Sequence, residues 1–366
     1  MAETVRNGSD DMTAISATSM DQSEHCHLFH FVVDTVLTGV LCLFGFAGNT
    51  MAFMTIWPEK FTVTTYLLEA IIVSDLAVVW MIFLGDCVPG LSWALQLLED
   101  CQRVCGYVSA VTRPLLQLAQ LCGVWLTLAV LVNRYLVMCR HGAAAILQNG
   151  PSAARRHVIV IVIVATVVTL PLTVERHVDV TVDDGNGTLT RHLHDVYWYQ
   201  LLYHDLIGTL LVYVIPLVLQ LVLLMRLACV VHSVNQLRSS LATSFRLHHV
   251  DITQLVLTLS VTMVICYTPL IIEKTLLWIQ GHPAMCCATL TFYLHSFARL
   301  FTALNSSMKM VLLLLFVGDF RHRLGEMLTC YWASEKDTDQ LTTGYTMYRC
   351  PDMSEMTLIS NVDSRT

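Results

Sequence analysis

Charged side chains inside long apolar stretches are the residues of this sequence most suited to chemistry. The stretch from Leu115 to Val132 contains no charge and is followed at once by Asn133, Arg134 and Tyr135. A charge in the membrane interior is costly unless it faces protein or a water-filled cavity, so Arg134 is a candidate functional residue. Alternatively, Arg134 could extend to the lipid headgroups as an interfacial side chain.

Lys309 raises the same question, because it lies within the apolar stretch at 289–317. Its ammonium group needs a polar or charged partner, or it must extend along the helix to the headgroups. Polar residues also interrupt the first halves of the apolar stretches at 106–138 and 200–228. They are Arg113, Gln117, Gln120, Tyr203, His204 and Asp205. We expect these residues to line a polar cavity on one side of a membrane.

The elements that must position these residues are membrane-spanning helices. Of the 366 residues, 55% are hydrophobic and 13% are charged, whereas about a quarter of the residues in a soluble domain are charged. Seven apolar stretches have roughly the length that crosses a bilayer, at 30–57, 65–85, 106–138, 157–174, 200–228, 251–279 and 289–317. The sequence therefore predicts an all-α membrane protein, a seven-transmembrane helix bundle. With a net charge of -7 and no basic face, we expect no nucleic-acid partner.

The distribution of Lys and Arg predicts that the N-terminus is extracellular. Basic residues gather in the loops on one side, as in cytoplasmic loops, namely Lys60, Arg140, Arg155, Arg156, Arg226, Arg238, Arg246, Arg321 and Arg323. Asn7 and Asn186 begin glycosylation acceptor motifs and fall in outer segments. The N-terminal tail, 1–28, is polar and acidic, unlike a cleavable signal peptide, so the first span is expected to direct membrane insertion.

The last part of the chain predicts a short amphipathic helix and a disordered tail. Basic and apolar residues alternate at helical spacing from Asp319 to Leu328, as in a helix that lies on membrane lipid. Cys330 follows this helix and is a candidate for palmitoylation, although a free thiol is the alternative. We therefore expect a membrane domain at 29–330 and a Ser- and Thr-rich disordered cytoplasmic tail at 331–366.

Short motifs in successive spans resemble those of the rhodopsin-like (class A) G-protein-coupled receptors. The motifs are Gly48-Asn49, Ser74-Asp75-Leu76-Ala77, Asn133-Arg134-Tyr135, Pro216 and Cys266-Tyr267-Thr268-Pro269. Within that class, three features are similar to the FMRFamide and myosuppressin neuropeptide receptors. They are LAQLCGVWLTLAVLVNRYLVMC, TLPLTVE at 169–175, and Leu304-Asn305-Ser306-Ser307 with the later Phe320-Arg321. The resemblance covers roughly 30–330.

This resemblance implies a plasma-membrane receptor that signals through a heterotrimeric G protein, with arrestin as a further partner of the tail. It implies no catalytic residue, cofactor or metal. Pro216 and Pro269 each remove a helical hydrogen bond and kink a span, and Arg134 contacts the G protein when the sixth span moves. Two other functions stay open: a non-signalling scaffold, and a transporter that uses Asp75, Lys309 and Arg134 as a charge relay.

Two departures from the class pattern affect the expected switch. Asn133 replaces the acidic residue before Arg134, which predicts raised ligand-independent activity, because the resting state loses a charge-assisted hydrogen bond; an equivalent neutral bond is the alternative. Lys309 stands in the altered motif of the seventh span. By the resemblance, Asp75 lies where the class often holds a sodium ion, so we expect Lys309 to replace that ion. The polar cluster would be completed by Asn49, Asn305 and Ser306.

The outer disulfide implied by the resemblance lacks its usual second cysteine, because 172–203 contains none. Cys101 or Cys105 would therefore pair elsewhere or stay free. The other candidates for this bridge, all in or beside outer segments, are Cys26, Cys87, Cys286 and Cys287. We expect at least one bridge from the head of the third span to the N-terminus or the last outer loop.

The implied peptide site lies in the outer half of the bundle. Its candidate residues are Asp86, Arg113, Gln117, Gln120, Glu175, Tyr213, Tyr267, Glu273, His295 and Arg299. A peptide that ends in Arg-Phe-amide needs a carboxylate for the arginine and an aromatic pocket for the phenyl ring. We expect Glu175 or Glu273 to bind the arginine. Alternatively, many of these side chains could simply satisfy one another across the bundle.

Overall fold

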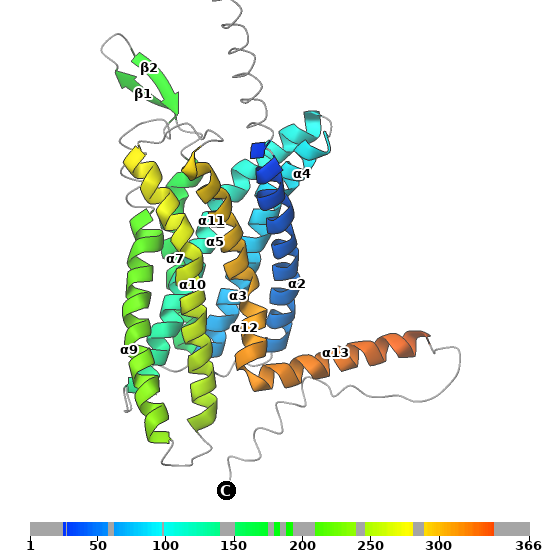
Figure 1. The fold of residues 1–366 in the computed structure, drawn as a ribbon, viewed down its shortest axis with the longest axis vertical. Helices are drawn as coiled ribbons and strands as arrows, with labels where there is room; N and C mark the ends of the chain where they lie inside the picture. The colour runs from blue at the N-terminus through cyan, green and yellow to red at the C-terminus, as the bar shows by residue number, and fades with distance from the viewer. Residues whose placement is uncertain are drawn as a thin grey trace, which may run out of the picture.

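The chain folds as a bundle of long helices (Figure 1). A computed structural model describes residues 25–26, 28–57, 62–96, 99–139, 151–174, 179–183, 188–192, 209–238, 246–280 and 289–339. The helices are α2 (Thr38–Ile56), α3 (Val63–Ile82), α4 (Val88–Ala94), α5 (Glu99–Cys139), α7 (Pro151–Val174), α9 (Ile215–Arg238), α10 (Arg246–Gln280), α11 (Leu290–Ser307), α12 (Lys309–Phe316) and α13 (Gly318–Asp339). The protein is therefore a helical membrane protein.

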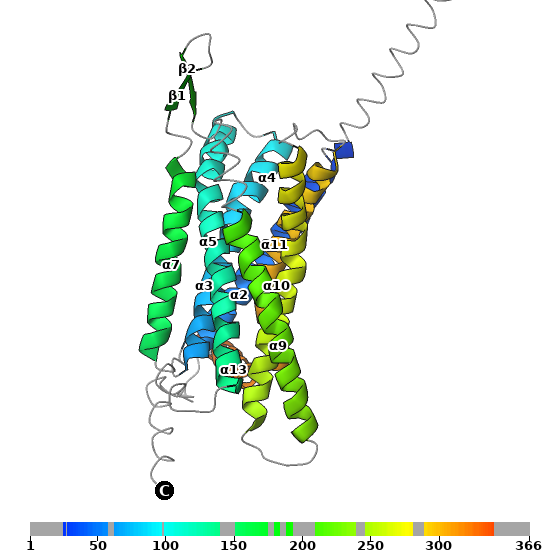
Figure 2. The same ribbon diagram turned by 90° about the vertical axis from the view of Figure 1, so that its left-hand side faces the viewer.

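Among the residues that the structure describes, six helical segments are apolar and long enough to cross a membrane. They are Leu28–Ile56, Val63–Ala94, Cys101–Met138, Ser152–Pro171, Leu210–Ser233 and Ile252–Gln280. The pair α11 and α12 reaches the same criteria jointly but is bent by 40° between Ser307 and Lys309. Figure 2 shows α5 inside the bundle, and α5 contacts α3, α7, α9 and α10. This central helix carries Arg134 near one end.

The bend between α11 and α12 occurs without a proline. The Ser307 hydroxyl donates to the Ala303 carbonyl at 2.7 Å and to the Leu41 carbonyl of α2 at 2.8 Å. A serine that bonds back to its own helix bends that helix, and adjacent serines are a recurrent cause of kinks. After the bend, α12 leads into α13, which runs sideways from the end of the bundle, roughly perpendicular to the long helices (Figure 1).

In the described ranges, three π-helical segments widen the helices near the end of the bundle opposite α13. They are η1 (Phe31–Leu37), η2 (Phe83–Cys87) and η5 (Leu210–Val214). Short π-helical segments often occur at functional sites, because the extra residue per turn redirects side chains. Each segment here carries a polar residue toward the interior, namely Asp34, Asp86 and Tyr213.

A β-hairpin between α7 and η5 departs from the predicted all-α chain. Strands β1 (Asp179–Asp183) and β2 (Thr188–His192) pair antiparallel, with Asp183 opposite Thr188. Both strands are rich in β-branched residues, which favour extended backbone. The hairpin lies at the end of the bundle opposite α13 (Figures 1 and 2). We use "hairpin end" and "α13 end" for the two ends below.

Gly45 permits the close contact between α2 and α11. A Cβ atom at position 45 would overlap the Ser307 hydroxyl and would lie 3.1 Å from the Ser307 Cα. We expect Gly45→Ala to lower the free energy of unfolding by about 1–3 kcal/mol through overpacking. Thermal unfolding of the purified protein in detergent measures this loss.

Gly106→Ala is the matched control, because a Cβ at position 106 meets no atom within 4 Å. Removing a glycine from a helix should leave stability unchanged or raise it by up to about 1 kcal/mol. Equal effects at positions 45 and 106 would contradict the packing role of Gly45.

Candidate functional site

Two tyrosines and a glutamine meet between α5, η5 and α10. The Tyr213 hydroxyl donates to Gln120 Oε1 at 2.9 Å, and both side chains are buried. The rings of Tyr213 and Tyr267 lie 5.7 Å apart, centroid to centroid. The structure thus brings together three of the predicted ligand residues as a buried aromatic and amide cluster.

Glu273 on α10 and His295 on α11 form a second contact. His295 Nδ1 lies 2.8 Å from Glu273 Oε1. Glu273 is 1% exposed, whereas the His295 side chain is 31% exposed. A buried carboxylate needs a partner, and a half-exposed imidazole is one that an incoming cation could displace.

A third group joins η1, η2 and α11. Arg299 forms an ion pair with Asp86. Asp34 Oδ2 accepts a hydrogen bond from the Ser296 hydroxyl at 2.8 Å and lies 3.2 Å from His30 Nε2. Asp34 was not among the residues predicted from the sequence. Its signal was available, because Asp34 is a carboxylate inside the apolar stretch at 30–57.

Three predicted ligand residues lie apart from these groups or outside the described residues. Arg113 is exposed on α5 and Gln117 is half-buried. Within the described part of the chain, no hydrogen bond joins Gln117 to the groups above. Two carboxylates were predicted to bind the arginine of the ligand, Glu175 and Glu273. Glu175 lies outside the described residues, whereas Glu273 is described.

Asp75 and Lys309 form a buried ion pair in the middle of the bundle. The Lys309 Nζ lies 3.7 Å from Asp75 Oδ2, and both side chains are almost fully buried. Asn49 Nδ2 donates to the Ser306 carbonyl at 2.8 Å. The space beside the pair is about 10 Å³, which is enough for one water molecule and too little for a hydrated ion.

Several buried polar side chains of this region keep an oxygen without a hydrogen bond, and of these Asp75 and Asn305 line the small space. Buried oxygens without a hydrogen-bond partner among the described residues include Asp75 Oδ2, Asn49 Oδ1, Asn305 Oδ1 and the Ser306 hydroxyl. An ammonium group carries three donors, so Lys309 is the cation suited to these acceptors. The structure thus gathers all five residues of the predicted polar cluster around α12.

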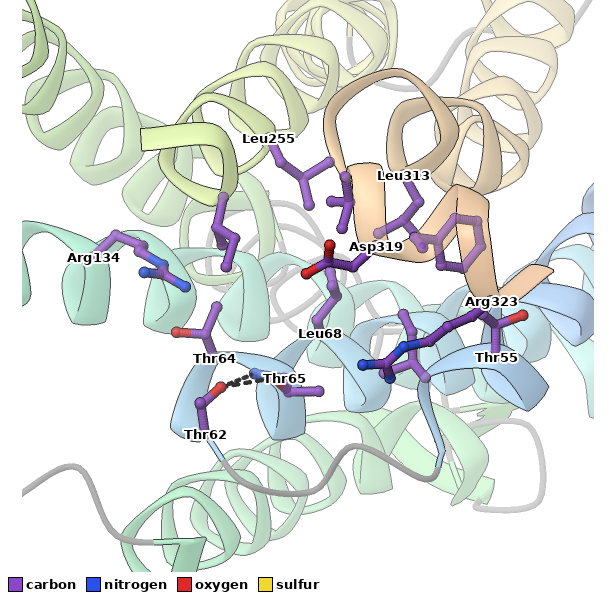
Figure 3. Close-up of a pocket in the computed structure, with 14 residues that line it drawn as sticks. Thr55, Thr62, Thr64, Thr65, Leu68, Arg134, Leu255, Leu313, Asp319 and Arg323 are labelled. Carbon is purple, nitrogen blue, oxygen red and sulfur yellow. Dashed lines mark hydrogen bonds between the residues drawn. The ribbon is translucent and has the colours of Figure 1, made fainter. Parts of the chain in front are cut away.

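Arg134 lies at the α13 end, beside a pocket of about 150 Å³. Arg134 on α5 and Arg323 on α13 reach the pocket from opposite sides, with Asp319 between them (Figure 3). Arg134 is 5% exposed, and its Nε has no hydrogen-bond partner among the described residues. Its side chain therefore faces the pocket rather than lipid headgroups.

The neighbours of Arg134 are directed elsewhere. Asn133 Nδ2 donates to the Thr64 hydroxyl of α3 at 3.1 Å, so Asn133 stabilises the contact between α5 and α3. Tyr135 is half-buried. Among the kink candidates, Pro269 lies inside α10 and Pro216 follows η5 at the start of α9.

The predicted outer disulfide is not formed by the described cysteines of α5. Cys101 is exposed and Cys105 is half-buried, and both carry free thiols. Cys87 is also a free thiol; it is buried and donates to the Asp34 carbonyl at 3.5 Å. The structure therefore shows no bridge from Cys101 or Cys105 among the described residues, and the expected bridge stays a prediction.

Other predicted sites lie beyond the described part of the chain. Asn7, Asn186, Cys286 and Cys287 fall in ranges that the structure does not describe, and so does most of the tail at 331–366. The buried Cys26 precedes η1, and the backbone of Cys330 lies in α13. Comparisons with protein-family models and with curated proteins find no match.

The Asp75–Lys309 pair generates a double-substitution test. Removing one partner of a buried ion pair costs about 3–5 kcal/mol, whereas replacing both by apolar residues is often neutral. We expect Asp75→Leu and Lys309→Met to destabilise singly, and their combination to recover most of the loss in thermal unfolding.

Lys274→Met, which removes a lysine of α10 outside the pair, is the control. Its effect should add to that of Asp75→Leu, because distant sites are independent. If the effect of Lys309→Met also simply added to that of Asp75→Leu, the two residues would not be coupled. Lys309 would then extend to the headgroups, and the ion pair would have no role in stability.

Proposed function

We propose that this chain is a rhodopsin-like (class A) G-protein-coupled receptor at the plasma membrane, with its N-terminus outside the cell. In this proposal the bent pair α11 and α12 forms the seventh span. α13 is the eighth helix and lies on the inner leaflet. The hairpin end is then extracellular and the α13 end is cytoplasmic.

The position of Arg134 is the observation that carries the proposal. Its guanidinium borders a pocket at the α13 end that is bounded by Ile252 and Leu255 of α10 and by Leu313 of α12. α10 contains Pro269, so its cytoplasmic half can swing as a unit. An outward swing would expose Arg134 to a G protein. Signalling is then a shift between closed and open populations, with no covalent chemistry.

An amidated neuropeptide is the ligand that the polar groups at the hairpin end favour. Glu273 is buried and its partner, His295, is half-exposed, so an arginine of the ligand could replace the imidazole with a stronger, charge-assisted contact. Asp86 is less suited, since Arg299 already neutralises it. Tyr213 and Tyr267 would contact an aromatic ring of the ligand.

The proposal includes further partners and modifications. Arrestin would bind the Ser- and Thr-rich tail, Asn7 and Asn186 would be glycosylated, and Cys330 would be palmitoylated. A non-signalling scaffold is the second candidate, since Lys309 and Leu313 replace residues that other class members use for activation. A transporter is less favoured, because the space beside Asp75 and Lys309 is only about 10 Å³.

The ligand assignment predicts a loss of peptide potency when Glu273 is changed. Losing a charge-assisted hydrogen bond of about 1.5–3 kcal/mol corresponds to roughly a 10–100-fold loss. A G-protein dissociation assay in transfected cells, run with a library of amidated peptides, measures the potency of Glu273→Gln. Glu326→Gln removes an exposed carboxylate of α13 and should leave potency unchanged. Equal potency for both variants at matched surface expression would remove Glu273 from the site.

The switch predicts that Asn133→Asp lowers basal signalling. An aspartate would restore a carboxylate beside Arg134 and favour the closed state by about 1.5–3 kcal/mol. We expect second-messenger output without ligand to fall by about tenfold. Asn133→Ala, which only removes the hydrogen bond to Thr64, should not lower it. Unchanged basal output in Asn133→Asp would contradict the expectation that a carboxylate at this position favours the closed state.

A further inference from the structure

We propose that the pocket beside Arg134 binds a phosphate group, which supplies the anionic partner that Arg134 lacks within the described chain. This binding is independent of the proposed receptor function. Only its consequence for signalling, described below, rests on that function.

Arg134 provides the first reason. A buried guanidinium that leaves a donor unpaired carries a substantial desolvation cost. Arg134 Nε is such a donor, and no ion pair to Arg134 is present among the described residues. The neighbouring Asn133 cannot compensate, because it is neutral and its amide donates to Thr64. An anion in the pocket would remove this cost.

The N-terminus of α3 provides the second reason. Thr62 is the N-cap of this 20-residue helix, and its hydroxyl accepts from the Thr65 amide. The positive end of a helix dipole and its first amide groups favour phosphate. Thr62, Thr64 and Thr65 all line the pocket. The Thr64 hydroxyl accepts a hydrogen bond from Asn133 Nδ2. It can still donate its own proton, so Thr64 is a further donor beside the pocket.

The charge balance provides the third reason. Arg134 and Arg323 line the pocket from opposite sides, and Asp319 is the acidic residue between them (Figure 3). Two guanidinium groups and one carboxylate leave one positive charge. Guanidinium groups bind phosphate oxygens through paired hydrogen bonds. The volume of about 150 Å³ exceeds the need of a single water several-fold and admits a phosphate group.

Two sources could supply this phosphate group, and the chemistry that recognises it is the same. One is a phosphorylated inositol lipid, since the pocket borders the ends of α2 and α13 where the proposed inner leaflet lies. The other is soluble phosphate. In either case the bound anion would hold Arg134 in the closed pocket and would compete with a G protein. The anion would therefore act as an inhibitor of coupling.

Thermal unfolding of the purified full-length protein in detergent tests the binding without any G protein. Inorganic phosphate, titrated against chloride at matched ionic strength, should raise the midpoint by about 5 °C at saturation. Arg134→Gln and Arg323→Gln should each abolish most of this shift. Arg156→Gln, which removes an exposed arginine of α7 that does not line the pocket, should retain it.

Asp319→Asn separates a binding role from a merely structural one. Removing the carboxylate between the two arginines should increase the apparent phosphate affinity roughly tenfold, a gain that damaged folding cannot produce. Nanodiscs with and without phosphatidylinositol bisphosphate identify the source. Stabilisation in the lipid arm at phosphate concentrations that have no effect in detergent indicates the lipid headgroup.

Two results would overturn the proposal. One is an equal phosphate shift in wild type, Arg134→Gln and Arg323→Gln, which would indicate a general salt effect. The other is no shift in either the soluble or the lipid arm. Failure of G-protein coupling would leave these binding results unchanged, so the two proposals fail separately.

Discussion

The cost of burying charge among apolar helices is the constraint on which the rest of this structure depends. In the middle of the bundle, Asp75 and Lys309 compensate each other and so tie α3 to α12. Neither residue could be buried alone without a penalty of several kcal/mol. Because α12 follows the bend after Ser307, this pair also fixes the direction in which α13 leaves the bundle. A central ion pair thus positions one wall of the pocket at the α13 end.

Arg134 is also a buried charge, but no carboxylate of the described residues forms an ion pair with it. It lies at the end of α5, next to an asparagine whose amide is directed to Thr64. The result is a buried cation that faces a pocket. By contrast, the buried Lys309 and the partly exposed Arg299 each have a carboxylate partner. A site of this kind is suited to a partner that binds and leaves. Both the proposed G-protein contact and the proposed phosphate would be such partners.

The long apolar helices could be predicted from the sequence, because length and hydropathy alone determine which stretches can cross a bilayer. The contact between Lys309 and Asp75 could be expected, since a buried ammonium group limits its possible partners. The bend after Ser307 could not be predicted, because it depends on a hydrogen bond to Leu41 on another helix. The π-helical segments and the rotation of Asn133 toward Thr64 likewise result from tertiary packing. Asp34 could have been identified from its apolar surroundings alone.

In the proposed receptor, activation moves the inner half of α10 away from Arg134. Pulsed electron paramagnetic resonance between spin labels at the inner ends of α5 and α10 measures this movement in nanodiscs. The labels require unnatural amino acids, because the chain has 13 cysteines. With an activating amidated peptide and a G protein present, the account predicts a second, longer distance population. A single unchanged distance in the presence of a bound peptide and G protein would contradict it.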